Sequence, residues 1–312
     1  MDTRAEVFNE DCIAGMCERL DPESVHLTVT SIPFEELFTY SGKPEDVGNN
    51  GSTVNVREGR FALNMRFVIE QLHRVTAPGC NVCIHIQQLL AYKNQHGFIG
   101  RRDFRGAMID CFAAGGFEWK GEFAICKDPQ AMAQRLNLHS LMFISGKRNS
   151  NALAPAPNDY VLVFQKPGDV LTPVRAIRDA KINPDGWLTT DEWIRDAHGV
   201  WTDIDEFDIL DGARYAKEHD QEKHVCPLQL EVIRRLVKLY SNPAAVQPDG
   251  LVLDPFMGIG STAHVCVLEG RNVVGFELKE SYHANAVRNI ERARGMLAGR
   301  ASESVSLFGQ AV

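Results

Sequence analysis

The most informative stretch of the sequence reads Leu253-Asp254-Pro255-Phe256-Met257-Gly258-Ile259-Gly260-Ser261-Thr262-Ala263. It follows the buried-strand pattern of residues 251–253 and precedes a helix that the pattern predicts over residues 262–269. Glycines in such a turn let the backbone approach a ligand closely, and the N-terminus of the next helix presents free N–H groups. The stretch therefore predicts a ligand site at the end of a strand in an α/β fold.

Two kinds of ligand suit this turn. Gly258, Gly260 and Ala263 have the spacing of a dinucleotide fingerprint, and Glu277 ends the next predicted strand, where a carboxylate can bind ribose hydroxyls. This spacing leaves a nicotinamide-dependent dehydrogenase open. Asp254, however, places a carboxylate where a pyrophosphate would be repelled and a cationic ligand attracted. The sulfonium and ammonium groups of S-adenosylmethionine fit that charge, so we expect this cofactor.

A second motif follows the strand predicted over residues 24–30 and reads Ser31-Ile32-Pro33-Phe34. The two strands should end at the same edge of the sheet. Two acceptors that bind the hydrogens of an exocyclic base amine leave its nitrogen lone pair free to attack. The Ser31 hydroxyl and the Ile32 carbonyl can act as these acceptors, and the Phe34 ring can stack on the base.

Together the two motifs resemble those of the DNA amino-methyltransferases, the N4-cytosine/N6-adenine family. The turn is similar to the family's cofactor motif, and residues 31–34 are similar to its (Asp/Asn/Ser)-Pro-Pro-aromatic catalytic motif. The catalytic motif comes first, as in the permuted β-type members. Asp11 resembles the acid that meets the cofactor adenine, and residues 224–229 resemble the segment before the cofactor motif.

The resemblance implies a Rossmann-like S-adenosylmethionine-dependent methyltransferase fold of the α/β class, with a mostly parallel sheet and an inserted recognition region. Residues 1–90 would form the catalytic half, 91–222 the remaining sheet elements and the target-recognition insert, 223–295 the cofactor half and 296–312 a flexible tail. The substrate would be double-stranded DNA, from which the target base is extruded.

The resemblance also assigns roles to individual residues. The catalytic set is Ser31, Ile32, Pro33 and Phe34. The cofactor-binding set is Asp11, Asp254, Pro255, Phe256, Gly258, Gly260, Ser261, Thr262 and Glu277. Candidates for contact with DNA lie in two predicted loops and are Arg101, Arg102, Arg105, Lys147 and Arg148.

One position departs from the family. Ile32 replaces the first proline of the catalytic motif, so the fixed backbone angle of that proline is lost. A degenerate relative that binds cofactor or DNA without catalysis is therefore an alternative. A methyltransferase of RNA or of protein glutamine is another, although glutamine methylases place their loop after the cofactor motif. Serine at position 31 is commoner among the cytosine-N4 enzymes, and the choice of base stays open.

Charge is unevenly distributed along the chain. Over its 312 residues, 33 Lys and Arg face 41 Asp and Glu, for a net charge of −8, which by itself disfavours a protein that coats nucleic acid. Residues 95–181 nevertheless hold 12 basic and 8 acidic residues, a balance of +4. Residues 182–222 hold 3 basic and 12 acidic residues, a balance of −9, together with Trp187, Trp193 and Trp201. This acidic stretch is either a surface insert or a contact for another subunit.

Several classes are excluded by what the sequence lacks. No apolar run approaches the ~18 residues of a membrane span, and the acidic start is unlike a signal peptide, so we expect a cytoplasmic protein. Cys80 and Cys83 form the one CxxC pair, within a buried-strand pattern that indicates core packing, and no metal site is expected. The sequence leaves open a homodimer and a cognate restriction enzyme.

Overall fold

The computed structural model describes residues 3–34, 46–47, 57, 59–136, 139–210 and 227–308. The strands are β1 (Ala5–Phe8), β2 (Val25–Ser31), β3 (Thr76–Gln87), β4 (Leu89–Ala91), β5 (Gly100–Arg102), β6 (Glu118–Ile125), β7 (Asp159–Gln165), β8 (Val200–Trp201), β9 (Leu251–Asp254) and β10 (Asn272–Phe276). The helices are α1 (Cys12–Arg19), α2 (Arg60–Val75), α3 (Lys93–His96), α4 (Phe104–Ala114), α5 (Pro129–Arg135), η2 (His139–Leu141), α6 (Phe143–Arg148), η3 (Ser150–Ala152), α7 (Thr190–Asp196), α9 (Leu230–Tyr240), α10 (Ser261–Leu268) and α11 (Glu280–Phe308). The sequence pattern also predicts a loop over residues 42–59. Most of it, together with residues 224–226, lies outside the described parts.

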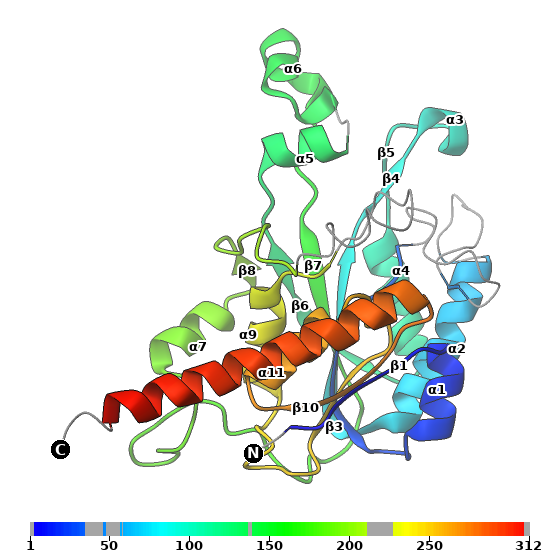
Figure 1. Cartoon of the computed structure of the whole chain (residues 1–312). Coiled ribbons are helices and arrows are strands. Elements are labelled where there is room, and N and C mark those ends of the chain that lie inside the picture. The colour runs from blue at the N-terminus through cyan, green and yellow to red at the C-terminus, as the bar shows by residue number, and fades with distance from the viewer. Residues whose placement is uncertain are drawn as a thin grey trace.

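One large sheet organises the molecule, with strand order β1-β10-β9-β2-β3-β7-β6-β8 (Figure 1). The five strands from β1 to β3 run parallel, β7 is antiparallel to both of its neighbours, and β8 pairs parallel with β6. Segments from the two ends of the chain meet at its centre, because β2 pairs with β9. The prediction of a mostly parallel α/β fold is confirmed.

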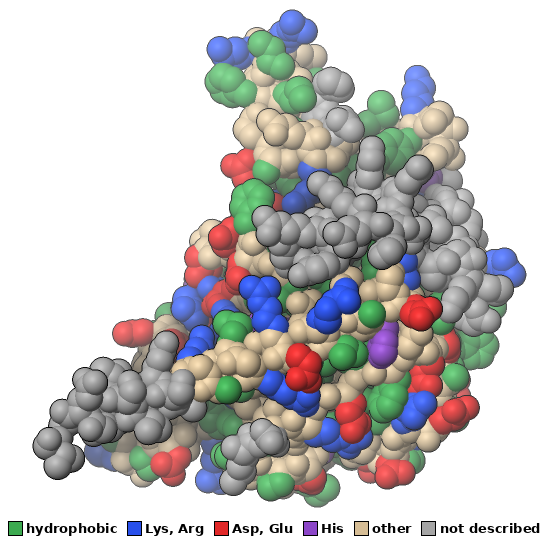
Figure 2. Space-filling model, viewed as in Figure 1, with side chains coloured by type: hydrophobic (Ala, Val, Ile, Leu, Met, Phe, Trp, Pro, Cys, Tyr) green, Lys and Arg blue, Asp and Glu red, His purple; other side chains and the backbone are tan. Residues whose placement is uncertain are grey.

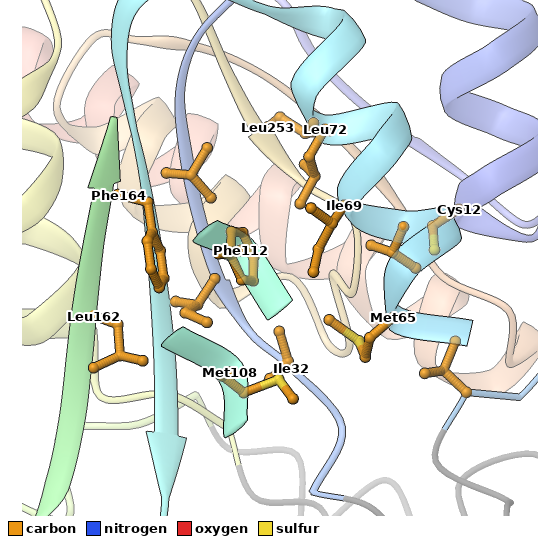
Figure 3. Packing of buried hydrophobic residues seen from close by; sticks show 14 of the residues in the cluster. Cys12, Ile32, Met65, Ile69, Leu72, Met108, Phe112, Leu162, Phe164 and Leu253 are labelled. Atoms are coloured by element: carbon orange, nitrogen blue, oxygen red, sulfur yellow. The ribbon is translucent and has the colours of Figure 1, made fainter. Parts of the chain in front are cut away.

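Helices cover both faces of the sheet. On one face α1, α2 and α4 pack over a core that includes Ile69, Met108 and Phe164 (Figure 3). On the other face α9, α10 and α11 pack over Val29, Val252 and their neighbours (Figure 1). Since both faces of the parallel strands are buried, these strands are apolar throughout, as the sequence pattern indicates.

The pattern of residues 61–75 predicts an amphipathic helix with Leu63, Phe67, Leu72 and Val75 near one face, but α2 turns a different face to the core. Leu63 and Phe67 share a face but are 50% and 49% exposed, whereas Leu72 and Val75 are buried. At 3.6 residues per turn, Leu72 lies roughly 140° around the helix from Phe67, so the four residues cannot share one face. The buried face of α2 also carries Phe61, Met65 and Ile69.

Two ends of the chain also differ from expectation. Residues 5–8 form the unpredicted strand β1, which pairs with β10 and is half-buried. The sequence pattern predicts a closing helix that ends at Arg294, whereas α11 continues to Phe308. Among the described residues, no helix combines the length and apolar character needed to cross a bilayer.

Two projections leave the sheet at the edge where β2 and β9 end. The first is the hairpin β4–β5 with α3, which follows β3. The second carries α5 and α6 between β6 and β7, and both rise from the same side of the body (Figure 1). The sequence pattern predicts a loop over residues 145–158, but the structure is helical there over the end of α6 and over η3.

The acidic stretch is packed onto the body rather than being a free insert. Its edge strand β8 places Trp201 against Phe123, with ring centroids 4.5 Å apart. The buried Arg235 of α9 pairs with Asp203 at 2.6 Å and with Asp196 at 3.3 Å. Part of the negative charge of residues 182–210 is thus neutralised within the molecule, and residues 211–222 lie outside the described parts.

Candidate functional site

A pocket opens at the carboxyl edge of β2, β9 and β10, where ligands bind in open α/β sheets. Both sequence motifs line it. The predicted residues that line it are Ser31, Pro33, Phe34, Asp11, Asp254, Pro255, Phe256, Gly258, Ser261, Thr262 and Glu277. Gly260 and Ile32 are not among the lining residues. The two motifs, more than 200 residues apart in the chain, therefore meet because β2 and β9 are neighbours.

Three of the four predicted catalytic residues face the pocket. Ser31 ends β2, and the Phe34 ring lies edge-on to the His85 ring, with centroids 5.9 Å apart. Phe34 lines the pocket but is only 6% exposed, so only a small part of its side chain faces the pocket. Ile32 instead points its side chain into the core near Met108 (Figure 3). Its hydrophobic side chain is therefore used for packing.

Asp254 holds the Gly-rich turn in place. Its Oδ1 accepts hydrogen bonds from Thr30 Oγ1 at 2.6 Å and from the Phe256 N–H at 3.0 Å, and its Oδ2 accepts from Thr262 Oγ1 at 2.6 Å. Burial raises the pKa of this carboxyl to about 6, against the lowering effect of the three hydrogen bonds. Asp254 thus ties the end of β9 to β2 and to α10, besides adding an acid to the pocket.

The two glycines of the turn adopt left-handed backbone angles. Gly258 has φ +55°, and its N–H donates a 2.8 Å hydrogen bond to Glu277 Oε2. Gly260 caps α10 with φ +89°, and a Cβ there would lie 2.8 Å from the Ala286 backbone. Gly258 therefore positions the carboxylate that follows β10, and Gly260 allows α10 and α11 to pack closely.

Glu277 lies where the sequence analysis places the ribose-binding acid. Its Oε1 accepts from the Lys279 N–H at 2.8 Å, which with the Gly258 contact fixes the carboxylate at the pocket wall. Burial raises its pKa to about 7, and the nearby Asp254 and Asp46 add to the rise. A positively charged ligand in this pocket would relieve that repulsion.

The pocket fits S-adenosylmethionine in two respects. Three acids, Asp254, Glu277 and Asp46, surround a space that would suit the sulfonium and ammonium groups. The buried Ser261 Oγ lines the pocket and has no hydrogen-bond partner among the described residues, so a donor or acceptor is available to a bound polar group. Asp11 caps α1 through the Ile13 and Ala14 N–H groups and presents its carboxylate at the rim.

Three polar residues behind Ser31 were missed by the sequence analysis. Ser31 Oγ lies 3.0 Å from His85 Nδ1, and His85 Nε2 lies 3.1 Å from Asp159 Oδ2. The ammonium of Lys127 lies 2.9 Å from the same Asp159 oxygen. The sequence could not reveal this group, because its residues lie in or just after different strands and have no regular spacing along the chain. Pro227 and Leu228 also line the pocket; they belong to residues 224–229, which resemble the segment before the family's cofactor motif.

Of the five predicted DNA-binding residues, the three on β5 and α4 are at least partly buried, and the two on α6 are exposed. Arg102 lies in β5 and is buried, with Nε 3.4 Å from the Leu90 carbonyl, so it belongs to the hairpin rather than to an exposed loop. Arg105 is on α4 and binds Glu122 at 2.5 Å. Arg101 is half-buried in β5. Lys147 and Arg148 are exposed on α6, at the end of the second projection, where Figure 2 shows basic side chains beside hydrophobic ones.

The described residues contain no group of three His, Cys, Asp or Glu side chains able to hold a metal ion. Cys80 and Cys83 are free thiols on β3, and Cys83 is buried in the core.

Comparison with known proteins points to one family. The family model described as DNA methylase, of the N6 and N4 methyltransferases, matches residues 25–288. Among curated relatives, the type II methyltransferase M.MthZI of Methanothermobacter thermautotrophicus is 26% identical over 84% of this chain and 70% of its own length. The type II methyltransferase M.MjaI of Methanocaldococcus jannaschii is 24% identical over 86% of each chain.

Solved structures share the fold. A candidate DNA modification methylase from Thermus thermophilus, in complex with S-adenosylmethionine, superposes with a TM-score of 0.64 at 20% identity, over 93% of this chain and 94% of the other. The cytosine-N4-specific PvuII DNA methyltransferase superposes with a TM-score of 0.57 at 18% identity, over 92% and 87%.

Proposed function

Since the chain belongs to the DNA methylase family of N6 and N4 methyltransferases, we propose that it methylates an exocyclic base amine of double-stranded DNA, adenine N6 or cytosine N4. The observation that carries this proposal is the pocket in which Ser31, Pro33 and Phe34 stand beside Asp254 and Glu277. S-adenosylmethionine, when bound there, supplies an electrophilic methyl group.

Glu277 would accept hydrogen bonds from the ribose hydroxyls of the cofactor, because its carboxylate is fixed at the pocket wall by two backbone N–H groups. The side chains of Asp11 and Ser261 stand at the same pocket and can bind further polar groups of the cofactor. Asp254 would act mainly by holding the turn, since both of its oxygens already accept hydrogen bonds within the protein.

The amine of the target base would lie against Ser31, whose hydroxyl can accept one of its hydrogens. When Ser31 accepts this hydrogen, the lone pair of the amine nitrogen turns away from the base ring and toward the methyl donor. Phe34 offers part of its ring as a stacking surface. A base inside a duplex cannot reach this pocket, so we propose that it is flipped out, at a cost of a few kcal/mol.

Two projections at this edge of the sheet suit contact with the duplex. The tip of the second projection carries Lys147 and Arg148, exposed and suited to phosphate. Phe143, 70% exposed, and Ile144, 53% exposed, lie beside them. We assign this tip to DNA binding and assign Arg102 and Arg105 to the structure of the protein, since each is held by other residues.

The test is incubation of the protein with isotope-labelled S-adenosylmethionine and unmethylated, PCR-amplified genomic DNA, followed by nucleoside mass spectrometry. The expected product is N6-methyladenine or N4-methylcytosine. Ser31→Ala is expected to bind cofactor normally in calorimetry but to lose turnover. Cofactor binding without either product would contradict the proposal and favour a non-catalytic relative, and label found in RNA or protein instead would redirect the substrate.

A further inference from the structure

A line of polar side chains crosses the sheet behind the pocket. Only Ser31, at one end of the line, has a role in the reaction proposed above. It consists of Ser31, His85, Asp159 and Lys127, which come from β2, β3, β7 and the residue two positions beyond the end of β6. These strands are neighbours in the sheet in that order.

Strand register explains why the four side chains meet. Ser31 pairs with His85, and Asp159 pairs with Gln87 on one side and Ile125 on the other. Gln87 is two residues from His85, and Lys127 is two residues from Ile125. Side chains two apart share one face of a sheet, so all four point to the same face at the same edge.

Each contact in the line has a defined direction. Asp159 is a buried acceptor, so His85 Nε2 carries the hydrogen that it donates over 3.1 Å. His85 Nδ1 then has a free lone pair and accepts the Ser31 hydroxyl hydrogen over 3.0 Å. This leaves the Ser31 oxygen as an acceptor toward the pocket, as the amine requires.

The Asp159 carboxylate at the centre of the line has a partner on each side. Burial raises the pKa of this carboxyl, but His85 and Lys127 outweigh burial and hold that pKa below its usual value. The Lys127 ammonium, whose side chain is 2% exposed, forms an ion pair with Asp159 at 2.9 Å. Lys127 therefore balances the charge of the buried carboxylate whose oxygen accepts the His85 Nε2 hydrogen.

We propose that His85 is a positioning residue for methyl transfer that takes up, through Ser31, the proton released by the methylated amine. Methylation leaves the amine nitrogen positively charged, because it still carries both of its hydrogens. As one N–H bond breaks, its proton goes to the Ser31 oxygen, and the Ser31 hydroxyl proton goes to His85 Nδ1. The electron pair of the broken N–H bond stays on the methylated nitrogen, and the imidazolium later loses its proton to water.

This inference rests on the proposed function and is tested with His85→Gln. A Gln oxygen can accept the Ser31 hydrogen bond but takes up no proton at neutral pH. We expect kcat to fall about 100-fold, in the range of lost general-base catalysis, while the Kd for S-adenosylmethionine and the KM for DNA stay within about two-fold. His26→Gln is the matched control: His26 is a half-buried histidine on β2 that accepts a hydrogen bond from the Leu251 N–H. It should leave kcat unchanged.

Two further readouts separate proton uptake from a structural role. The double variant Ser31→Ala/His85→Gln should be no slower than Ser31→Ala alone, because the two residues act as one unit. The pH profile of kcat should lose its acidic limb in His85→Gln. Among the described residues, the polar and charged groups next to His85 are Ser31 and Asp159, with Lys127 beyond Asp159.

The outcomes distinguish this inference from the proposed function. A wild-type protein that methylates no DNA contradicts the proposed function. Wild-type activity together with a normal kcat in His85→Gln overturns only the inference. The inference is also overturned if His85→Gln is slow but keeps the wild-type pH profile. It is overturned as well if the loss of kcat in His85→Gln adds fully to that of Ser31→Ala in the double variant. A variant that also loses cofactor binding assigns His85 to structure and overturns it as well.

Discussion

At the scale of single residues, the pocket depends on side chains that hold its backbone as much as on those that face a ligand. Asp254 accepts three hydrogen bonds that join β9, β2 and α10, and the N–H of Gly258 fixes Glu277. The sequence pattern identifies these positions, but it assigns them to ligand binding alone. Their internal bonds could not be foreseen, because Thr30 lies 224 residues from Asp254.

The two glycines of the turn should respond differently to alanine. Gly260→Ala places a methyl group 2.8 Å from the Ala286 backbone and adds strain at φ +89°, so we expect a loss of about 3 kcal/mol in the free energy of unfolding. Gly258→Ala meets no atom within 4 Å and should cost only about 1 kcal/mol of left-handed strain. Urea unfolding measures both, and equal losses would contradict the packing role of Gly260.

Asp254 should make stability depend on pH. Its pKa is about 6 in the folded protein against an ordinary value of 3.8, so between these values the folded chain holds a proton that the unfolded chain lacks. This contribution to stability is present below pH 4 and is lost as the pH rises through 6. The free energy of unfolding of Asp254→Asn minus that of wild type should therefore fall by up to about 3 kcal/mol on acidification from pH 7.5 to 4.

Urea unfolding of both proteins across this range measures the effect. Asp179→Asn is the control of opposite sign, because the N–H groups of Ile182 and Lys181 lower the pKa of that exposed carboxyl. A difference between Asp254→Asn and wild type that grows on acidification would show that folding does not raise the Asp254 pKa.

At the scale of elements, the strands and helices nearest the pocket could be predicted, and those of the two projections could not. Residues 251–253 and 273–276 are apolar and short, as in a strand buried on both faces, and the structure has β9 and β10 there. Strands β4 and β5 have three residues each, which is too short for a pattern of alternating residues to identify. The sequence pattern therefore places Arg102 in an exposed loop, although pairing with β4 buries it.

The tip of α6 should contribute to DNA affinity through charge. The double variant Lys147→Gln/Arg148→Gln removes two exposed cations from this helix. If both meet phosphates, the slope of log K against log salt concentration should become shallower by about 1.8. Fluorescence anisotropy with a DNA duplex at several salt concentrations measures it. The control, Arg292→Gln/Arg294→Gln on the exposed side of α11, should keep the wild-type slope.

At the scale of the whole molecule, the acidic residues and the proposed DNA-binding tip occupy different places. The acidic stretch of residues 182–210 packs against α9 and, through its own strand β8, against β6, and its Asp203 and Asp196 neutralise Arg235. Six of the twelve basic residues of the stretch 95–181 lie on β5, α4 and the α5–α6 projection, namely Arg101, Arg102, Arg105, Arg135, Lys147 and Arg148. A net charge of −8 is therefore compatible with an enzyme of DNA.

Hydrogen exchange should divide the molecule along the sheet. The central strands β9, β2 and β3 have neighbours on both sides and are buried on both faces, so their amides should exchange last. The edge strand β8 has two residues, and α6 buries none of its side chains, so both should exchange much sooner. Mass spectrometry of peptic fragments measures this order, and a protected α6 would contradict it.

The pairing of β1 with β10 and of β2 with β9 has a consequence during synthesis. The first strand leaves the ribosome long before residues 272–276, with which it pairs in the sheet, have been translated. The end of β2 likewise waits for residues 251–254. The nascent chain must therefore carry two incompletely paired strands through most of translation, a period in which chaperones can protect it, and its pocket can form only once the cofactor half has emerged.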